Sequence, residues 1–396
     1  MATTIELRFC SRPESYIESV PPRHLYIHVP FCTRRCSYCD FSIAVRKAVP
    51  VAAYLSCLRA EFNALKVTTA AAGDRGSAVA VPLDTVYVGG GTPSRLGGDG
   101  IRDLLSLVRE FHCLASDAEV TIEANPEDVS ANAVNAWANA GVNRISLGLQ
   151  TFDDEALQWM HRSHSAAQSI EAIKYVNEGG IANVSIDLIF GLPPGLITSW
   201  RADVDRALEL SPSHISLYGL TVEPATPLAR WTSRGLTQLT PDDRYADEFL
   251  YAHAAATAAG FIHYEVSNFA MPGSRSRHNS AYWSGVPYVG VGPSAHSFDG
   301  IRRQWNVSAY AEWARRLTGN EGVTAGEEVL SGENRAAERV YLGLRTENGL
   351  TVKGRDLGSA RTWVDHGWAV LHDSVVRLTP EGWLRLDSLA AGLTGI

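Results

Sequence analysis

The chain has 396 residues, 45% of them hydrophobic and 20% charged, which is enough to bury a large core and fits one large domain with a smaller one. Its formal net charge of −8 leaves no broad basic surface for phosphates, so we expect no nucleic acid among its partners. Residues 1–20 lack the apolar run of a signal peptide and six cysteines are too sparse for a disulfide framework, which together predict a cytoplasmic protein with reduced thiols.

Short β-rich runs alternate with segments of helical periodicity in the first half of the chain. The six runs are 24–29, 85–89, 119–123, 144–149, 183–190 and 214–220. Repeated βα units favour parallel strands with right-handed crossovers, and ligands then gather at the carboxyl ends of the strands. We predict an α/β fold in the form of a partial (β/α)6 barrel, although a doubly wound open sheet would give the same local pattern.

The βα rhythm ends near residue 225. A helix is predicted near 242–259, a strand over 263–269 and a Gly- and Pro-rich stretch up to 300, while 66–83 is expected to be a surface loop. A helix over 333–345, a strand pair over 369–378 and a last helix over 380–393 suggest a winged-helix-like module. The predicted parts are an N-terminal segment 1–22, a barrel 23–260, a connecting region 261–325 and a smaller C-terminal α/β winged-helix-like domain 326–396.

Three cysteines, Cys32, Cys36 and Cys39, lie in one loop directly after the first predicted strand. Three thiolates can hold three irons of a [4Fe-4S] cluster and leave the fourth iron open to an exchangeable ligand. A structural zinc site would need a fourth ligand, and no second Cys pair or nearby Cys-His pair supplies it. A disulfide plus a free thiol is the less favoured alternative, because cytoplasmic thiols stay reduced. We therefore predict an iron–sulfur cluster on this loop.

Glycines and a carboxylate follow the next two predicted strands. Gly90 and Gly91 would let the backbone approach a ligand closely, and Thr92 adds a hydroxyl group. Glu123 ends the third strand, where its carboxylate could accept a hydrogen bond from an ammonium or a ribose hydroxyl, or could simply be solvated.

Three further polar residues belong to the later βα units. Asp187 interrupts an apolar strand, so it must be hydrogen-bonded or face a polar cavity. Gln150 ends the fourth strand and Arg162 follows it, and for these two a satisfied amide and a surface ion pair are equally good alternatives.

The chain resembles the radical S-adenosylmethionine (SAM) proteins, within them the oxygen-independent coproporphyrinogen dehydrogenase family and its relatives. The segments that carry the resemblance are Tyr26-Ile-His-Val-Pro-Phe-Cys32, Gly89-Gly-Gly-Thr-Pro-Ser94, Gly148-Leu-Gln-Thr-Phe152, Asp187-Leu-Ile-Phe-Gly-Leu-Pro193 and Tyr264-Glu-Val-Ser-Asn-Phe269. The resemblance implies that SAM chelates the open iron and that an electron donor reduces the cluster. It implies a first SAM site at Tyr26, Gly90 and Glu123, a second at Gly91, Thr92, Gln150, Arg162 and Asp187, and Tyr38 near the adenine.

Two features separate the branches of this family. The decarboxylating enzymes carry another cysteine soon after the third cluster ligand and a longer N-terminal extension, whereas here Asp40 and Phe41 follow Cys39 and only 31 residues precede Cys32. Cys-Asp-Phe instead resembles the HemW-type heme chaperones. This implies heme as cargo, apo-hemoproteins such as respiratory enzymes as recipients, and a possible dimer.

A second motif, His278-Asn-x-x-Tyr282-Trp283, also matches the HemW-type branch. A histidine can bind heme iron while Tyr and Trp offer flat faces to a porphyrin, so His278 is the predicted heme ligand and His296 a weaker candidate. A buried, hydrogen-bonded His278 is the structural alternative. Oxygen-independent oxidation of coproporphyrinogen III to protoporphyrinogen IX stays open as the alternative function, and a redox-sensing Fe-S protein as a third.

Overall fold

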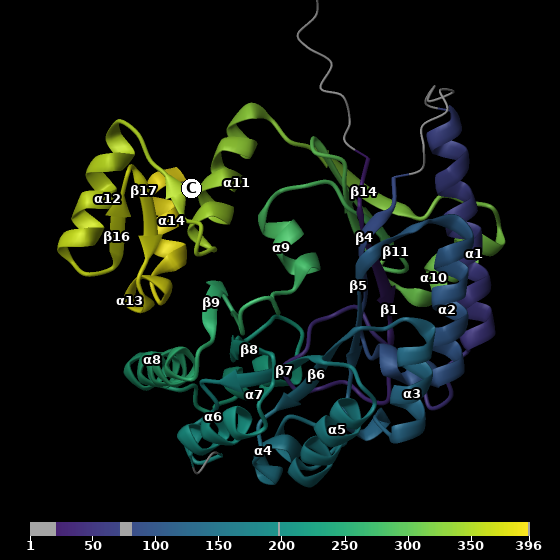
Figure 1. Cartoon of the computed structure of the whole chain (residues 1–396), viewed down its shortest axis with the longest axis horizontal. Helices are drawn as coiled ribbons and strands as arrows, with labels where there is room; N and C mark the ends of the chain where they lie inside the picture. The colour runs from purple at the N-terminus through teal and green to yellow at the C-terminus, as the bar shows by residue number, and fades with distance from the viewer. Residues whose placement is uncertain (1–20, 72–80, 197–198, 395–396) are drawn as a thin grey trace, which may run out of the picture.

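A nine-stranded sheet forms the centre of the molecule, in the order β11-β1-β4-β5-β6-β7-β8-β10-β9 (Figure 1). The computed structural model describes residues 21–394 except 72–80 and 197–198. The six predicted strands are all present and parallel to one another: β1 (His24–Val29), β4 (Leu83–Gly90), β5 (Leu114–Ala124), β6 (Arg144–Gln150), β7 (Asn183–Phe190) and β8 (His214–Gly219). Within the described residues β11 and β9 do not pair, so the sheet is a partial barrel, and the predicted fold class is confirmed.

Helices follow the parallel strands and lie along the outside of the curved sheet (Figure 1). They are α1 (Val51–Ala71), α2 (Gly97–Phe111), α3 (Ala131–Ala140), α4 (Asp154–Trp159), α5 (Ala166–Glu178) and α6 (Trp200–Glu209), with short 3-10 turns at Pro93–Leu96 and Pro126–Asp128. The caps follow from the sequence: the Ser165 hydroxyl and the Gln168 side chain form a capping box at the start of α5. At the end of α3, Gly141 adopts a φ of 100°, which glycine tolerates without strain.

The region after β8 adds strands to both edges of the sheet. The segment predicted as one strand over 263–269 is an antiparallel pair, β9 (Ile262–Glu265) and β10 (Asn268–Ala270), with a turn between them. At the other edge β11 (Val289–Val291) pairs in parallel with β1. Strands of three or four residues are too short to show a period in the sequence.

The remaining elements before the C-terminal part are short strands and helices that connect or flank the main sheet. They are β2 (Phe31–Cys32), β3 (Ala44–Val45), α7 (Pro227–Ser233), α8 (Asp242–Ala258), α9 (Arg277–Trp283), α10 (Tyr310–Thr318) and the sheet of β12 (His296–Phe298), β13 (Arg302–Asn306) and β14 (Thr324–Val329). The prediction for 66–83 was wrong at its start, because α1 continues to Ala71; residues 72–80 lie outside the described part. Trp313 of α10 is fully buried in the main core, which therefore includes part of the predicted connecting region.

The C-terminal part, yellow-green to yellow in Figure 1, has a hydrophobic cluster of its own. Its elements are α11 (Gly332–Leu344), β15 (Leu350–Thr351), α12 (Arg355–Asp365), β16 (Ala369–His372), β17 (Val375–Leu378), α13 (Pro380–Trp383) and α14 (Leu386–Thr394). The helix predicted over 380–393 is thus two helices. Trp383 packs on His263 of β9 with ring centroids 4.4 Å apart, which ties this part to the edge of the main sheet. The domain boundaries at 22/23, 260/261 and 325/326 stay a prediction.

Candidate functional site

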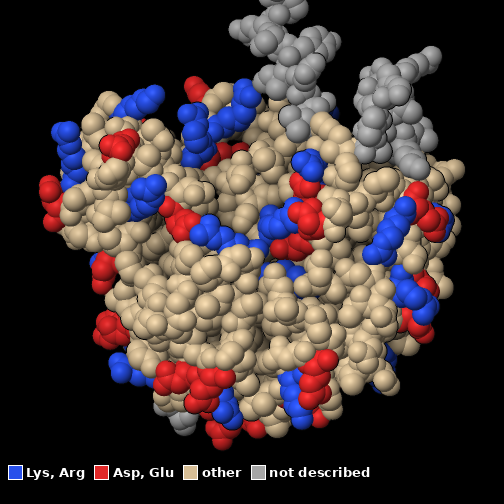
Figure 2. Space-filling model, in the orientation of Figure 1, with Lys and Arg blue, Asp and Glu red and all other residues tan. Residues whose placement is uncertain are grey.

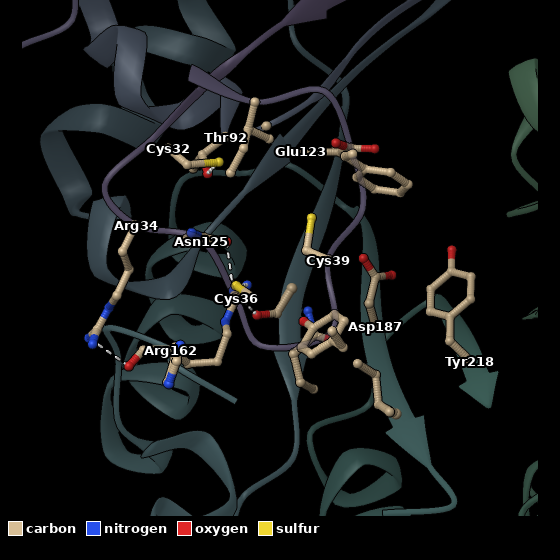
Figure 3. A pocket seen from close by; sticks show the side chains of 18 of the residues that line it. Cys32, Arg34, Cys36, Cys39, Thr92, Glu123, Asn125, Arg162, Asp187 and Tyr218 are labelled. Carbon is tan, nitrogen blue, oxygen red and sulfur yellow. Dashed lines mark hydrogen bonds between the residues drawn. The ribbon is translucent and has the colours of Figure 1, made fainter. Parts of the chain in front are cut away.

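A cavity of about 450 Å³ lies at the carboxyl ends of the parallel strands (Figure 3). Its lining includes all the predicted cluster and SAM residues except Tyr26: Cys32, Cys36, Tyr38, Cys39, Gly90, Gly91, Thr92, Glu123, Gln150, Arg162 and Asp187. These residues come from separate βα units, and the parallel topology brings them to one end of the barrel. Whether each contacts a bound group stays a prediction.

The three loop cysteines are free thiols, partly buried at the cavity wall. Cys32 Sγ lies 3.4 Å from Thr92 Oγ1, and Arg162 Nη1 donates to Cys36 Sγ at 3.7 Å. Burial raises the pKa of the Cys39 thiol to about 11 and also raises the pKa of Cys32. Both thiols are therefore protonated at neutral pH, and binding of a metal would release their protons.

The arrangement of the thiols fits an iron–sulfur cluster. Figure 3 shows Cys32, Cys36 and Cys39 spread around the loop. Throughout the described part of the chain, no three His, Cys, Asp or Glu side chains surround a point that a single metal ion could occupy. A cubane suits spread thiolates because each of them binds a different iron. The soft sulfur donors and the partly buried setting also match such a cluster.

Glu123 is held by two donors at the cavity edge. Tyr87 Oη donates to Oε1 at 2.8 Å and the Gly90 amide donates to Oε2 at 2.9 Å. Burial raises the pKa of Glu123 to about 7, despite both hydrogen bonds. Gly90 has a φ of 115°, and a Cβ at this position would lie 2.6 Å from the His28 ring, so only glycine fits the turn that presents its amide.

Asp187 both accepts hydrogen bonds and lines the cavity, as its position in an apolar strand predicted. Ser146 Oγ donates to its carboxylate at 3.0 and 3.1 Å, and Ser185 Oγ lies 3.3 Å away. Burial raises the pKa of Asp187. Its neighbours reveal a pattern that the sequence analysis missed: alternate residues of β6, β7 and β8 are polar, which is typical of strands that face a polar barrel interior. These residues are Arg144, Ser146, Gln150, Asn183, Ser185, Asp187, His214 and Ser216.

Arg162 is hydrogen-bonded to other residues of the cavity and is not part of a surface ion pair. Its Nη2 donates to Asn125 Oδ1 and to the Gly148 carbonyl, both at 2.7 Å. Asn125, which follows Glu123 by two positions, was missed because an Asn before Pro is an ordinary turn signal. Gln150 is nearly buried, with a left-handed φ of 73° at a register shift between β6 and β7.

His278 is buried against side chains of β1 and β4. Its Nδ1 lies 2.7 Å from Thr85 Oγ1 and its Nε2 lies 3.0 Å from the Tyr282 hydroxyl. The ring stacks on Tyr87, with centroids 5.0 Å apart, and burial lowers its pKa to about 3. Both ring nitrogens are therefore engaged, and heme ligation by His278 would require Nε2 to leave Tyr282.

Charge and hydropathy of the described part can be compared with the sequence expectations. On the face seen in Figure 2, Lys and Arg side chains lie intermixed with Asp and Glu. Among the described residues, no helix combines the length and the apolar character needed to span a bilayer.

Of the other cysteines, Cys57 is half-buried in α1 and Cys113 is exposed, while Cys10 lies outside the described residues.

Comparison with known proteins gives the following relationships. Residues 26–196 match the family model of the radical SAM superfamily. The chain is similar to the heme chaperone HemW of Mycobacterium tuberculosis strain H37Rv, with 38% identity over 384 residues, 94% of this chain and 95% of the relative. It is also similar to the heme chaperone HemW of Escherichia coli K12, with 40% identity over 278 residues, 70% of each chain. The solved coproporphyrinogen III oxidase HemN from Escherichia coli shares the fold, with a TM-score of 0.78 at 21% identity, covering 94% of this chain and 90% of HemN.

Proposed function

Because the chain belongs to the HemW heme chaperone family of the radical SAM superfamily, we propose that it binds heme and transfers it to apo-hemoproteins. It carries a [4Fe-4S] cluster and SAM. We assign the cluster to Cys32, Cys36 and Cys39, and SAM to the neighbouring strand ends, with Gly90 and Glu123 at its polar groups. The cluster supplies the electron chemistry when it is bound, and the protein orients SAM beside it.

The observation that carries the chaperone assignment, beside the relatives, is the segment after the third cysteine. Asp40 and Phe41 line the cluster cavity, and the Phe41 side chain is 62% exposed there. The family resemblance implies another cysteine in this neighbourhood for the decarboxylating enzymes. An exposed phenyl group at a cavity edge offers an apolar face to a flat macrocycle and has no redox chemistry.

Oxidative decarboxylation of coproporphyrinogen III is the alternative function. The similarity to HemN, which would favour this reaction, is a similarity of fold with 21% sequence identity. Fold alone does not fix the reaction, because one scaffold carries many chemistries.

The two functions are separated by one experiment on anaerobically reconstituted protein. With SAM and a reductant it should release no carbon dioxide from coproporphyrinogen III. It should bind hemin with one equivalent per chain and pass it to an apo-hemoprotein, followed by heme absorbance after separation of the two proteins. Carbon dioxide release on a par with a HemN control would establish the enzyme instead.

The finer assignments follow from the family resemblance and are part of the same proposal. The recipients are respiratory hemoproteins in the cytoplasm or at its membrane, an electron donor reduces the cluster, and two copies form a dimer. Co-purification with tagged apo-enzymes and sedimentation of the reconstituted protein test these points separately.

A further inference from the structure

A second cavity of about 760 Å³ adjoins the cluster cavity. The two share Asp40, Phe41, Gly90 and Glu123, so a molecule in the second cavity would lie beside the cluster site. Residues of α9, β12, β13 and α11 also line it, and α9 and α11 stand on one side of the central sheet in Figure 1. The cavity therefore joins the barrel to the first helix of the C-terminal part.

Aromatic side chains make up much of the wall of this cavity, which includes Tyr26, Tyr282, Trp283, Tyr288, Phe298 and Tyr341. Tyr282 and Tyr288 pack edge to face, with ring centroids 4.7 Å apart and an interplanar angle of 85°. Rings fixed in this way present flat apolar surfaces with few polar atoms, which suits a planar aromatic ligand. A cavity of this volume is also large enough for a tetrapyrrole, since drug-sized ligands occupy roughly 300–1,000 Å³.

Two histidines line the cavity, and only one of them has available nitrogen atoms. His28 is buried, with Nδ1 3.1 Å from the Tyr26 hydroxyl and Nε2 3.0 Å from the Ser42 carbonyl. His296 is exposed, and neither of its ring nitrogens has a hydrogen bond within the described part of the chain. Its ring is steadied by Trp305 of the neighbouring strand, with ring centroids 5.9 Å apart and an interplanar angle of 26°.

The protonation of the candidate ligands also favours His296. Partial burial and the nearby Arg303 lower its pKa, so the imidazole is neutral and has a lone pair at neutral pH. A tyrosine binds heme iron as the phenolate. Burial raises the pKa of Tyr282 and Tyr288, which keeps both phenols protonated.

We propose that heme occupies this second cavity, with its macrocycle against the aromatic wall and its iron bound by His296. The inference rests on the proposed chaperone function and deepens it by placing the cargo. The propionate edge of the heme points away from the end that the cavity shares with the cluster cavity, because that end carries the carboxyl groups of Asp40 and Glu123. Arg303 is already held by Glu328 and Glu338, both at 2.9 Å. The exposed Arg335 of α11 lies three positions before the lining residue Glu338, on the same face of the helix.

The proposal is tested by hemin titration of the full-length protein, with the absorbance spectrum as the readout. His296→Ala should weaken hemin binding by about tenfold or more and remove the signature of histidine ligation. Added imidazole should restore that signature in this variant. His296→Met should bind hemin with a spectrum different from that of the wild type.

Two further variants complete the design. His372→Ala removes an exposed histidine, 80% exposed at its side chain, and should leave the spectrum unchanged. His278→Ala should keep the histidine-ligated spectrum. Iron content after reconstitution checks that each variant is folded. An unchanged spectrum and affinity in His296→Ala would overturn the placement of the heme and leave the chaperone function intact. The same holds if His278→Ala loses the signature of histidine ligation and His296→Ala keeps it. Wild-type protein that binds no hemin would overturn the proposed function itself.

Discussion

The guanidinium of Arg162 lies 3.7 Å from Cys36 Sγ, although 126 residues separate the two in the chain. The same side chain bonds to Asn125 and to the Gly148 carbonyl, so it connects the cysteine loop with the ends of β5 and β6. A fixed cation thus lies next to one of the three cluster ligands. The charge balance of the site depends on this contact.

Removal of that cation should lower the reduction potential of the bound cluster. Reduction adds a negative charge, which a nearby guanidinium stabilises. We expect Arg162→Gln to shift the potential downward, on the order of 60 mV, which is about 1.4 kcal/mol for one electron. A redox titration followed by electron paramagnetic resonance measures the shift. Arg34→Gln is the matched control, because Arg34 belongs to the cysteine loop but its side chain is exposed. This variant should change the reduction potential much less.

Loss of one thiol should abolish the cluster. Oxygen is a poor replacement for sulfur at iron, so Cys36→Ser should fail to keep four irons per chain after anaerobic reconstitution. Iron and sulfide analysis checks this. Cys113→Ser, at an exposed cysteine outside the cavity, should reconstitute like the wild type. A Cys36→Ser protein with four irons would remove the cluster from this loop.

Glu123 should control SAM binding without holding the cluster. Glu123→Ala should weaken SAM binding, measured by equilibrium dialysis on reconstituted protein, and leave the iron count unchanged. Equal SAM affinity in the variant and the wild type would mean that Glu123 has only a structural role.

The affinity for SAM should also depend on pH through the same residue. Burial raises the pKa of Glu123 to about 7, so the carboxyl is protonated below that pH and ionised above it. The ionised form attracts the ammonium group of SAM, so affinity should rise between pH 6 and pH 8. Glu123→Gln should flatten this rise. A rise of the same size in Glu123→Gln would assign the titration to another group.

Glu61 should stabilise the junction between α1 and the strands that follow α9. Its carboxylate accepts from the Gly292 amide at 2.9 Å, from Asn306 Nδ2 at 2.6 Å and from Trp313 Nε1 at 3.1 Å. Glu61→Ala would leave these buried donors unpaired, and we expect a loss of about 2–4 kcal/mol in the free energy of unfolding. Denaturant unfolding measures it. Glu110→Ala, at an exposed ion pair with Arg59, should change the free energy of unfolding far less.

The sequence by itself determined the parts of the protein that depend on neighbours in the chain. The hydrophobic periodicity and the residue composition predicted the six parallel strands, because each strand buries its own apolar residues against adjacent helices. The predicted site residues lie at the ends of these strands, with a cysteine loop after the first strand and polar residues after later ones. They meet at one end of the sheet because the carboxyl ends of parallel strands lie together. The predicted cluster and SAM residues other than Tyr26 therefore line one cavity.

Only the tertiary structure decided the features that depend on distant contacts. The sequence predicted one strand over 263–269, whereas the structure has the pair β9 and β10 there, with β10 bound to β8. The three-residue strand β11 was not predicted, and it forms because β1 offers it unpaired backbone groups. The motif around His278 suggested a free ligand, whereas packing against Thr85, Tyr87 and Tyr282 occupies both ring nitrogens. The same packing leaves His296 open at the second cavity. The availability of a histidine nitrogen is set by the partners that the fold brings to it, and those partners lie up to 193 residues away.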